Sequence, residues 1–202
     1  MEALLLIDIQ NDFLPGGSLE VPEGDKIIEV VNRLQERFEL VVATQDWHPK
    51  NHKSFASNHP GKKVYDVIEL HGLEQILWPD HCVQDTPGAD FPPELHTAKI
   101  EAIFRKGMDP EIDTYSGFFD NGHLKTTGLA DYLRGKNVQQ VYLTGLAGDI
   151  CVYLSGIDSL QEGFDTYFIE DATRPLNQEE YQRVMKIYRE KGGKVIQSSE
   201  LL

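Results

Sequence analysis

The sequence has little positive charge. It carries 19 Lys and Arg residues against 33 Asp and Glu residues over 202 positions, a formal net charge of -14 at pH 7. A surface of this sign repels the phosphates of nucleic acids and of anionic membranes, so we expect the protein to bind neither. The sequence also lacks any apolar run of about 18 residues, and no transmembrane helix is expected.

Cysteine is scarce as well. The two cysteines, Cys82 and Cys151, are too few for a disulfide framework and form no C-x-x-C pair, which fits a reducing, cytoplasmic compartment. The apolar run that begins at Ala3 has no basic residue before it and meets Asp8 at once. We therefore expect a strand there and not a signal peptide.

Short apolar runs alternate with amphipathic segments along the chain. This alternation predicts a doubly wound α/β fold, with a mainly parallel six-stranded sheet and helices on both faces. The length fits a single domain over residues 1–202, with a long Pro-, Gly- and His-rich loop at about 45–93. The expected strands are Ala3–Asp8, Leu40–Thr44, Ile100–Lys106, Gln139–Leu146, Asp165–Ala172 and Lys194–Gln197. The expected helices are Asp25–Phe38, Leu129–Gly135, Asp149–Gly163 and Gln178–Gly192.

Reactive side chains follow several of these strands. Ligands of such sheets bind outside the carboxyl ends of the strands, where Asp8, Lys106 and Cys151 are expected to meet. Cys151 opens a helix, a position that favours its thiolate, and it could act as a nucleophile with Asp8 as base and Lys106 as orienting charge. Each residue also has a plainer interpretation: a buried structural cysteine, a strand-end cap and a solvated lysine.

The long loop holds candidate metal ligands. Asp46 and His48 are two residues apart, so in extended chain their side chains lie on one face, and His81 follows at the far end of the loop. One carboxylate and two imidazoles suit a divalent metal, zinc first, with iron or manganese as alternatives. His52 and Cys82 are further possible ligands. The remaining histidines are expected at the surface or in loops: His59, His71, His96 and His123.

Six motifs together resemble the nicotinamidases of the isochorismatase-like cysteine hydrolase superfamily. They occur in the right order and cover nearly the whole chain: "LLLIDIQNDFLPGGSL", "TQDWHP…H…SF", "WPDHCVQDTPGADF", "FRKG", "YSGFFD" and "TGLAGDICV". The resemblance implies the same α/β fold and the hydrolysis of the small molecule nicotinamide to nicotinate and ammonia through a cysteine thioester, a step of NAD salvage.

The resemblance also implies residue roles. The catalytic residues would be Asp8, Lys106 and Cys151. A cis peptide bond before Ala147 would aim the N–H groups of Ala147 and Cys151 at the substrate oxygen. The ring would lie between aromatic walls, and a metal would be held in the long loop, with His52 as a ligand in some relatives only. The implied wall residues are Phe13, Trp78 and Tyr115, and the implied metal ligands are Asp46, His48 and His81.

One position departs from the family pattern. Gly148 stands where relatives often have threonine, so the turn before the nucleophile is expected to be looser. The alternatives are another amidohydrolase acting on a carbamoyl or ureido compound, an isochorismatase, an inactive binding module and a redox thiol protein. The Asp-x-His…His set argues against the first of these, and the intact Asp8, Lys106 and Cys151 argue against the binding module. The sequence leaves open whether copies of the chain form a homo-oligomer.

Overall fold

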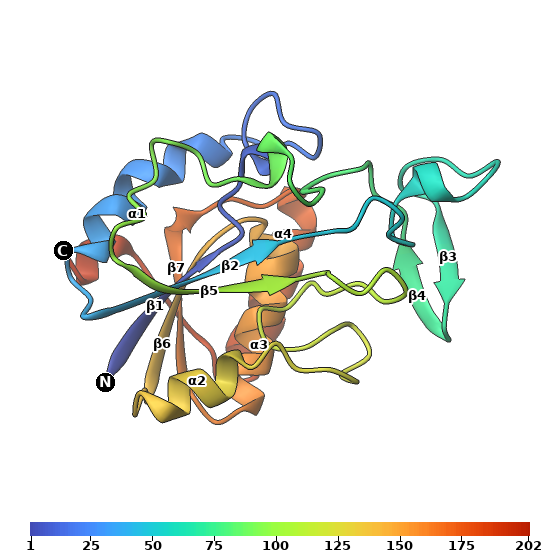
Figure 1. Cartoon of the computed structure of the whole chain (residues 1–202). Helices are drawn as coiled ribbons and strands as arrows, with labels where there is room; N and C mark the ends of the chain where they lie inside the picture. Colours follow the sequence, from blue (N-terminus) through green and yellow to red (C-terminus); the bar gives the residue numbers. More distant parts are fainter.

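The computed structural model describes residues 1–202 and contains a six-stranded, entirely parallel sheet (Figure 1). Each strand is a short apolar or alternating run, as expected for strands covered on both faces. The predicted fold class is confirmed. Across the sheet the order is β5 (Ile100–Lys106), β2 (Leu40–Asp46), β1 (Glu2–Ile7), β6 (Gln140–Gly145), β7 (Asp165–Thr173) and β8 (Lys194–Ile196).

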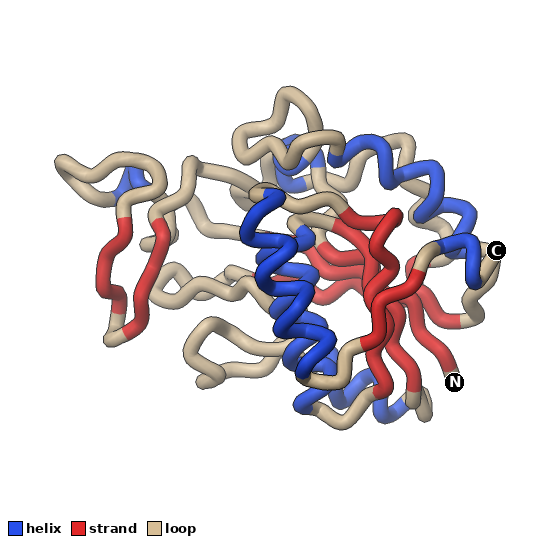
Figure 2. Tube along the Cα trace, turned by 180° about the vertical axis from the view of Figure 1, so that it is seen from behind, coloured by secondary structure: helices blue, strands red, loops and turns tan.

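Helices cover both faces of the sheet (Figures 1 and 2). Helix α1 (Ile28–Gln35) packs in one hydrophobic core with the strand residues that point its way, such as Leu4. The next residue, Leu5, points to the opposite face, because successive side chains of a strand alternate. The hydrophobic core on that opposite face holds residues of α2 (Leu129–Gly135), α3 (Tyr153–Gln161) and α4 (Gln178–Glu190).

None of the helices combines the length and apolar character needed to cross a bilayer.

The strand order reverses beside β1. The chain moves from β1 outward to β2 and β5, and then returns to the other side of β1 as β6 before it continues to β7 and β8. The loops that follow β1 and β6 therefore leave the sheet in opposite directions and open a crevice at its carboxyl edge. Asp8 follows β1 and Cys151 follows β6, so the topology brings both residues to this crevice.

The segment expected to be a loop at about 45–93 contains a hairpin, which corrects that prediction. Strands β3 (Val67–Leu70) and β4 (Leu73–Ile76) pair antiparallel and extend away from the main sheet (Figures 1 and 2). His71 and Gly72 between them have φ values of 51° and 80°, the combination that two-residue hairpin turns require. The strands are short, and all their residues but Gln75 are exposed or half-buried, so their sequence has little of the apolar alternation that marks a strand.

Two helices begin differently from the prediction. The segment expected to be one helix over Asp25–Phe38 is a 3₁₀ turn (Gly24–Ile27) followed by α1, which ends at Gln35. The segment expected to be a helix from Asp149 begins as a π-helical turn at Gly148–Val152, and α3 starts only at Tyr153. π-helical turns of this kind occur frequently at functional sites.

Candidate active site

Asp8 lies at the centre of the crevice. The strand β1 ends at Ile7, and Asp8 itself adopts φ = 48°, which turns the chain out of the sheet. Its side chain is fully buried. The hydroxyl of Thr44, on the neighbouring strand, donates to Asp8 Oδ1 at 2.6 Å and accepts from the Asp8 N–H at 3.2 Å. Thr44 therefore fixes the orientation of the carboxylate.

Lys106 links the buried carboxylates. It ends β5, is 2% exposed, and places Nζ 2.8 Å from Asp8 Oδ2 and 2.5 Å from Asp46 Oδ1. Nζ also donates to the backbone carbonyl oxygen of Thr114 at 2.9 Å, and Sγ of Cys151 lies 3.7 Å from Nζ. One ammonium thus stands between two carboxylates and a thiol, all of them buried.

Cys151 lies in the π-helical turn and faces this cluster. Ligand atoms of Asp8, Asp46 and Cys151 lie within 4.8 Å of one another. Burial raises the pKa of the Cys151 thiol well above its ordinary value, although Lys106 acts in the opposite direction. The helix-start argument favoured a thiolate at this position, and the structure differs because desolvation outweighs the local dipole and the ammonium. The resting group is a thiol that needs a base.

The two carboxylates beside Lys106 differ in their affinity for protons. Burial raises the pKa of Asp8 to about 6, with Asp46 adding to the rise and Lys106 opposing it. Burial alone would also raise the pKa of Asp46, but Lys106 and His48 hold it well below its usual range. Environments that push two carboxyl pKa values apart are typical of acid–base sites. Asp46 is therefore the permanent anion, and Asp8 is the group able to exchange a proton near neutral pH.

Hydrogen bonds of the Asp149 side chain anchor the turn that carries Cys151. Asp149 accepts the backbone N–H groups of Leu176 and Asn177, both at 2.8 Å. A Cβ atom at Gly148 would lie 2.7 Å from a methyl group of Thr173, so glycine fits here where a threonine would need the neighbours to move. This corrects the expectation of a looser turn. The peptide bond between Leu146 and Ala147 is cis.

Asp46, His48 and His81 come together beside this cluster. Oδ2 of Asp46 lies 3.6 Å from His48 Nε2 and 3.8 Å from His81 Nε2. The Nδ1 atoms of the two rings face the backbone carbonyls of Gly107 and Pro79, at 3.0 and 2.8 Å. With Nδ1 donating its hydrogen, each Nε2 keeps a lone pair turned toward the carboxylate. This arrangement of oriented imidazoles and a carboxylate can hold a divalent metal.

His52 lies at the edge of this group. Its Nδ1 accepts the backbone N–H of Ser54 at 3.1 Å and faces the Ser54 hydroxyl at 2.7 Å. Because Nδ1 accepts, the hydrogen of the neutral ring is on Nε2, which is buried without a hydrogen-bond partner. Burial lowers the pKa of His52 to about 4, so the ring is neutral. Cys82 lies in the hydrophobic core and is not in the Asp46 group.

A narrow cavity of about 30 Å³ reaches from this group to Cys151. The three aromatic residues predicted as walls all line it, from separate parts of the chain. Ala147 and Cys151, expected to face the substrate oxygen, line it as well. The sequence does not assign four further lining residues to the site: Leu19 and Ile150 lie within the quoted motifs, whereas Val21 and Leu176 have no polar or motif signal.

The chain matches a known protein family over almost its whole length. The Isochorismatase domain matches residues 2–200. The chain belongs to the isochorismatase family. It is 50% identical over 179 residues to the nicotinamidase of Escherichia coli (strain K12), covering 87% of this chain and 84% of that protein. The nicotinamidase resemblance of the sequence motifs is thereby confirmed, and with it the classification as a hydrolytic amidase.

Solved structures agree with this family assignment. The nicotinamidase/pyrazinamidase of Acinetobacter baumanii superposes with a TM-score of 0.97 at 43% identity, over 100% of this chain and 98% of that one. The pyrazinamidase of Pyrococcus horikoshii, solved in complex with zinc, superposes with a TM-score of 0.81 at 40% identity, over 97% and 98% of the two chains.

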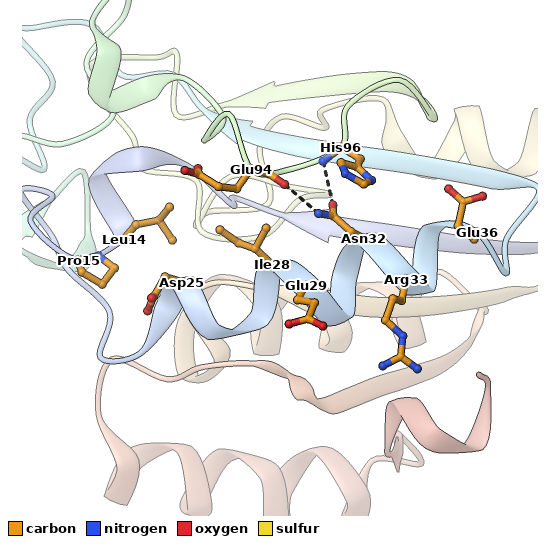
Figure 3. A pocket seen from close by; sticks show the side chains of 10 residues that line it. All are labelled: Leu14, Pro15, Asp25, Ile28, Glu29, Asn32, Arg33, Glu36, Glu94 and His96. Carbon is orange, nitrogen blue, oxygen red and sulfur yellow. Dashed lines mark hydrogen bonds between the residues drawn. The ribbon is translucent and has the colours of Figure 1, made fainter.

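The isochorismatase-family site is not the largest hollow of the molecule. An open groove of about 860 Å³ runs along one side of α1 (Figure 3). The side chain of Asn32 on α1 connects the two sides of the groove. Its amide nitrogen donates to the carbonyl of Glu94 and its oxygen accepts the N–H of His96, both at 2.8 Å. No cysteine lines this groove, and its walls are mostly exposed. The chemistry of the family therefore belongs to the smaller, buried cavity.

Other contributors to the site carried little sequence signal. The side chain of Gln10 pairs with the backbone at the end of β2. Its Nε2 donates to the Asp46 carbonyl and its Oε1 accepts the Asp46 N–H, both at 2.8 Å. Thr44 could have been found from its position two residues before Asp46, on the same face of the strand. Asp113 belongs to a segment that the sequence left unassigned, and Gln75 to the stretch expected to be a loop. Only the tertiary structure brings Asp113 to the cavity and joins Gln75 to it by hydrogen bonds.

Proposed function

We propose that the protein hydrolyses nicotinamide to nicotinate and ammonia through a thioester on Cys151. The observation that carries the proposal is the buried cluster of Cys151, Asp8 and Lys106 beside a group of metal-ligating side chains. The relatives named nicotinamidase support the substrate. The reaction is a step of NAD salvage, which fits a cytoplasmic enzyme.

The first half of the reaction forms the thioester. Asp8 takes the proton of the Cys151 thiol, and the thiolate attacks the carboxamide carbon. Lys106 keeps the charge of this buried cluster balanced while the proton moves. The backbone N–H groups of Ala147 and Cys151 stabilise the tetrahedral oxyanion. Asp8 then returns the proton to the nitrogen, and ammonia leaves.

The second half releases nicotinate. A water molecule attacks the thioester carbon while Asp8 accepts one of its protons. The C–S bond breaks, and the proton held by Asp8 returns to the sulfur, so the thiol and Asp8 are restored. The carboxylic acid formed gives its remaining proton to solvent and leaves as nicotinate. A pKa of about 6 suits both tasks, because a base and acid work best when their pKa lies near the working pH.

Asp46, His48 and His81 would hold a divalent metal. Zinc is the first candidate, supported by the zinc complex of the Pyrococcus horikoshii relative, with iron and manganese as alternatives. The bound metal would supply a Lewis-acid site for the pyridine nitrogen of the substrate. His52, whose free nitrogen is a donor, would lie outside the set of direct ligands. Phe13, Trp78 and Tyr115 would enclose the ring.

Ammonia release from nicotinamide tests the proposal. Purified wild-type protein should release ammonia, and Cys151→Ala should lose several orders of magnitude in kcat, because loss of one member disables a catalytic unit. Cys82→Ala is the matched control and should keep most of the turnover. Mass spectrometry of quenched wild-type protein should find an acyl group on Cys151. Retention of a tenth of the wild-type kcat in Cys151→Ala would contradict the covalent mechanism.

A further inference from the structure

The β3–β4 hairpin has a single buried side chain, and it is polar. In β4 only Gln75 is buried, at 3% exposure, while the residues of β3 are exposed or half-buried. The hairpin extends from the main sheet, and it contacts a hydrophobic core only through the partly buried Ile76 at its end. Burying the amide of Gln75 in a hairpin whose other side chains are exposed or half-buried calls for a hydrogen-bond partner.

The amide of Gln75 lies among residues of the substrate cavity. Its Nε2 atom lies 2.7 Å from the backbone carbonyl oxygen of Ile76, 3.0 Å from the Tyr115 hydroxyl oxygen and 3.2 Å from Asp113 Oδ2, and Tyr115 and Asp113 line the cavity. The indole N–H of Trp78 donates to the same Tyr115 oxygen at 3.0 Å. The hydroxyl oxygen of Tyr115 thus lies within hydrogen-bond distance of two donors, while the two hydrogens of the Gln75 amide have three acceptors in reach.

The hydrogen bonds at the Tyr115 hydroxyl restrain the positions of two aromatic rings that line the cavity. The rings of Tyr115 and Trp78 stand edge to face, with centroids 6.2 Å apart and planes at 82°. Packing alone allows such rings to shift, whereas a hydrogen bond at the end of each ring restrains it. The cavity between the walls and Cys151 is narrow, about 30 Å³, so the position of each wall decides how the substrate ring fits.

We propose that Gln75 is a positioning residue for the proposed hydrolysis. It holds Tyr115, and through the shared hydroxyl Trp78, against the ring of the bound substrate. Through Gln75 the hairpin supports the wall of the pocket. The inference rests on the proposed function for its kinetic consequence, but the restraint on the two rings is a property of the unliganded protein.

A double-mutant cycle tests this role. Gln75→Leu keeps the volume and removes the donors, and it should raise KM for nicotinamide about tenfold with a smaller change in kcat. In a Tyr115→Phe background, which lacks the shared oxygen, the same substitution should change KM less than threefold. Glu74→Gln, at the exposed neighbouring position, is the matched control and should leave KM and kcat unchanged.

Two further measurements separate positioning from general stability. Iodoacetamide labelling of Cys151 does not use the ring walls, so Gln75→Leu should alter its rate by less than twofold. In Trp47→Phe protein, Trp78 is the only tryptophan, and Gln75→Leu should shift its fluorescence emission to longer wavelength. Gln75→Glu, equal in shape but without the amide donors, repeats the measurements should Gln75→Leu not fold.

The outcomes are distinguishable. A KM within twofold of wild type, equal effects of Gln75→Leu with and without the Tyr115 hydroxyl, or a parallel loss of labelling and kcat would each overturn the positioning role. If wild-type protein releases no ammonia from nicotinamide, the proposed function fails. The fluorescence of Trp78 then still decides the inference, because an unchanged emission overturns it and a red shift supports it.

Discussion

Replacing Lys106 with methionine should destabilise the protein strongly and in a pH-dependent way. Met has a similar length but no charge, so Asp8 and Asp46 would remain buried without their shared cation. Breaking a buried ion pair from one side costs about 3–5 kcal/mol. For a chain of this size, each kcal/mol lowers Tm by about 2–4 °C, so a fall of about 6–20 °C is expected at pH 8.

Lys125→Met is the matched control. Lys125 also pairs with an aspartate, Asp109, but its side chain is 67% exposed. Exposed pairs contribute about 0–1 kcal/mol, so Tm should fall by no more than about 4 °C. Both variants and the wild type are compared by calorimetry after treatment with a chelator, so that a bound metal does not replace the missing cation at Asp46.

The pH dependence identifies the cause. Without Lys106, the pKa values of both carboxyl groups rise in the folded state and stay near 4 in the unfolded chain. A raised folded-state pKa favours the folded state at low pH, and this contribution is lost as the pH rises through it. The deficit of Lys106→Met should therefore shrink between pH 8 and pH 5. A deficit below about 1 kcal/mol at pH 8, or one that grows on acidification, would refute the reasoning.

Three further outcomes are expected. The kcat/KM for nicotinamide should fall below an apparent pKa near 6, because Asp8 is then protonated and cannot accept the thiol proton; a flat profile down to pH 4.5, with metal content verified at each pH, would contradict this assignment. Nicotinamide should exceed benzamide in kcat/KM by about two orders of magnitude, roughly 3 kcal/mol, and chelation should reduce that ratio; comparable use of both amides would argue against a metal bound to the ring nitrogen. Gly107→Ala should lower the metal content measured by mass spectrometry, because Gly107 has φ = 67° and a Cβ there would lie 2.3 Å from the His48 ring; unchanged metal content and affinity would exclude this coupling.

The sequence by itself determined the sheet and the position of its reactive edge. Runs such as Leu40–Ala43 are apolar throughout, as is typical of strands covered on both faces, and the helices between them have one apolar side. Residues that follow such strands must lie at one edge of a parallel sheet. The approach of Asp8, Lys106 and Cys151 could therefore be predicted from spacing, and their order matched a known family.

Tertiary structure alone decided how these residues behave. The high pKa of the Cys151 thiol and the contrast between Asp8 and Asp46 depend on complete burial around one ammonium, and neither has a signal in local sequence. The β3–β4 hairpin escaped prediction because its strands are too short and exposed to show an apolar period. Gln75 gains its partners only when that hairpin folds back on Tyr115, 40 residues further along the chain. Spacing along a sequence fixes which edge a residue reaches, whereas desolvation and long-range hydrogen bonds exist only once distant segments have packed together.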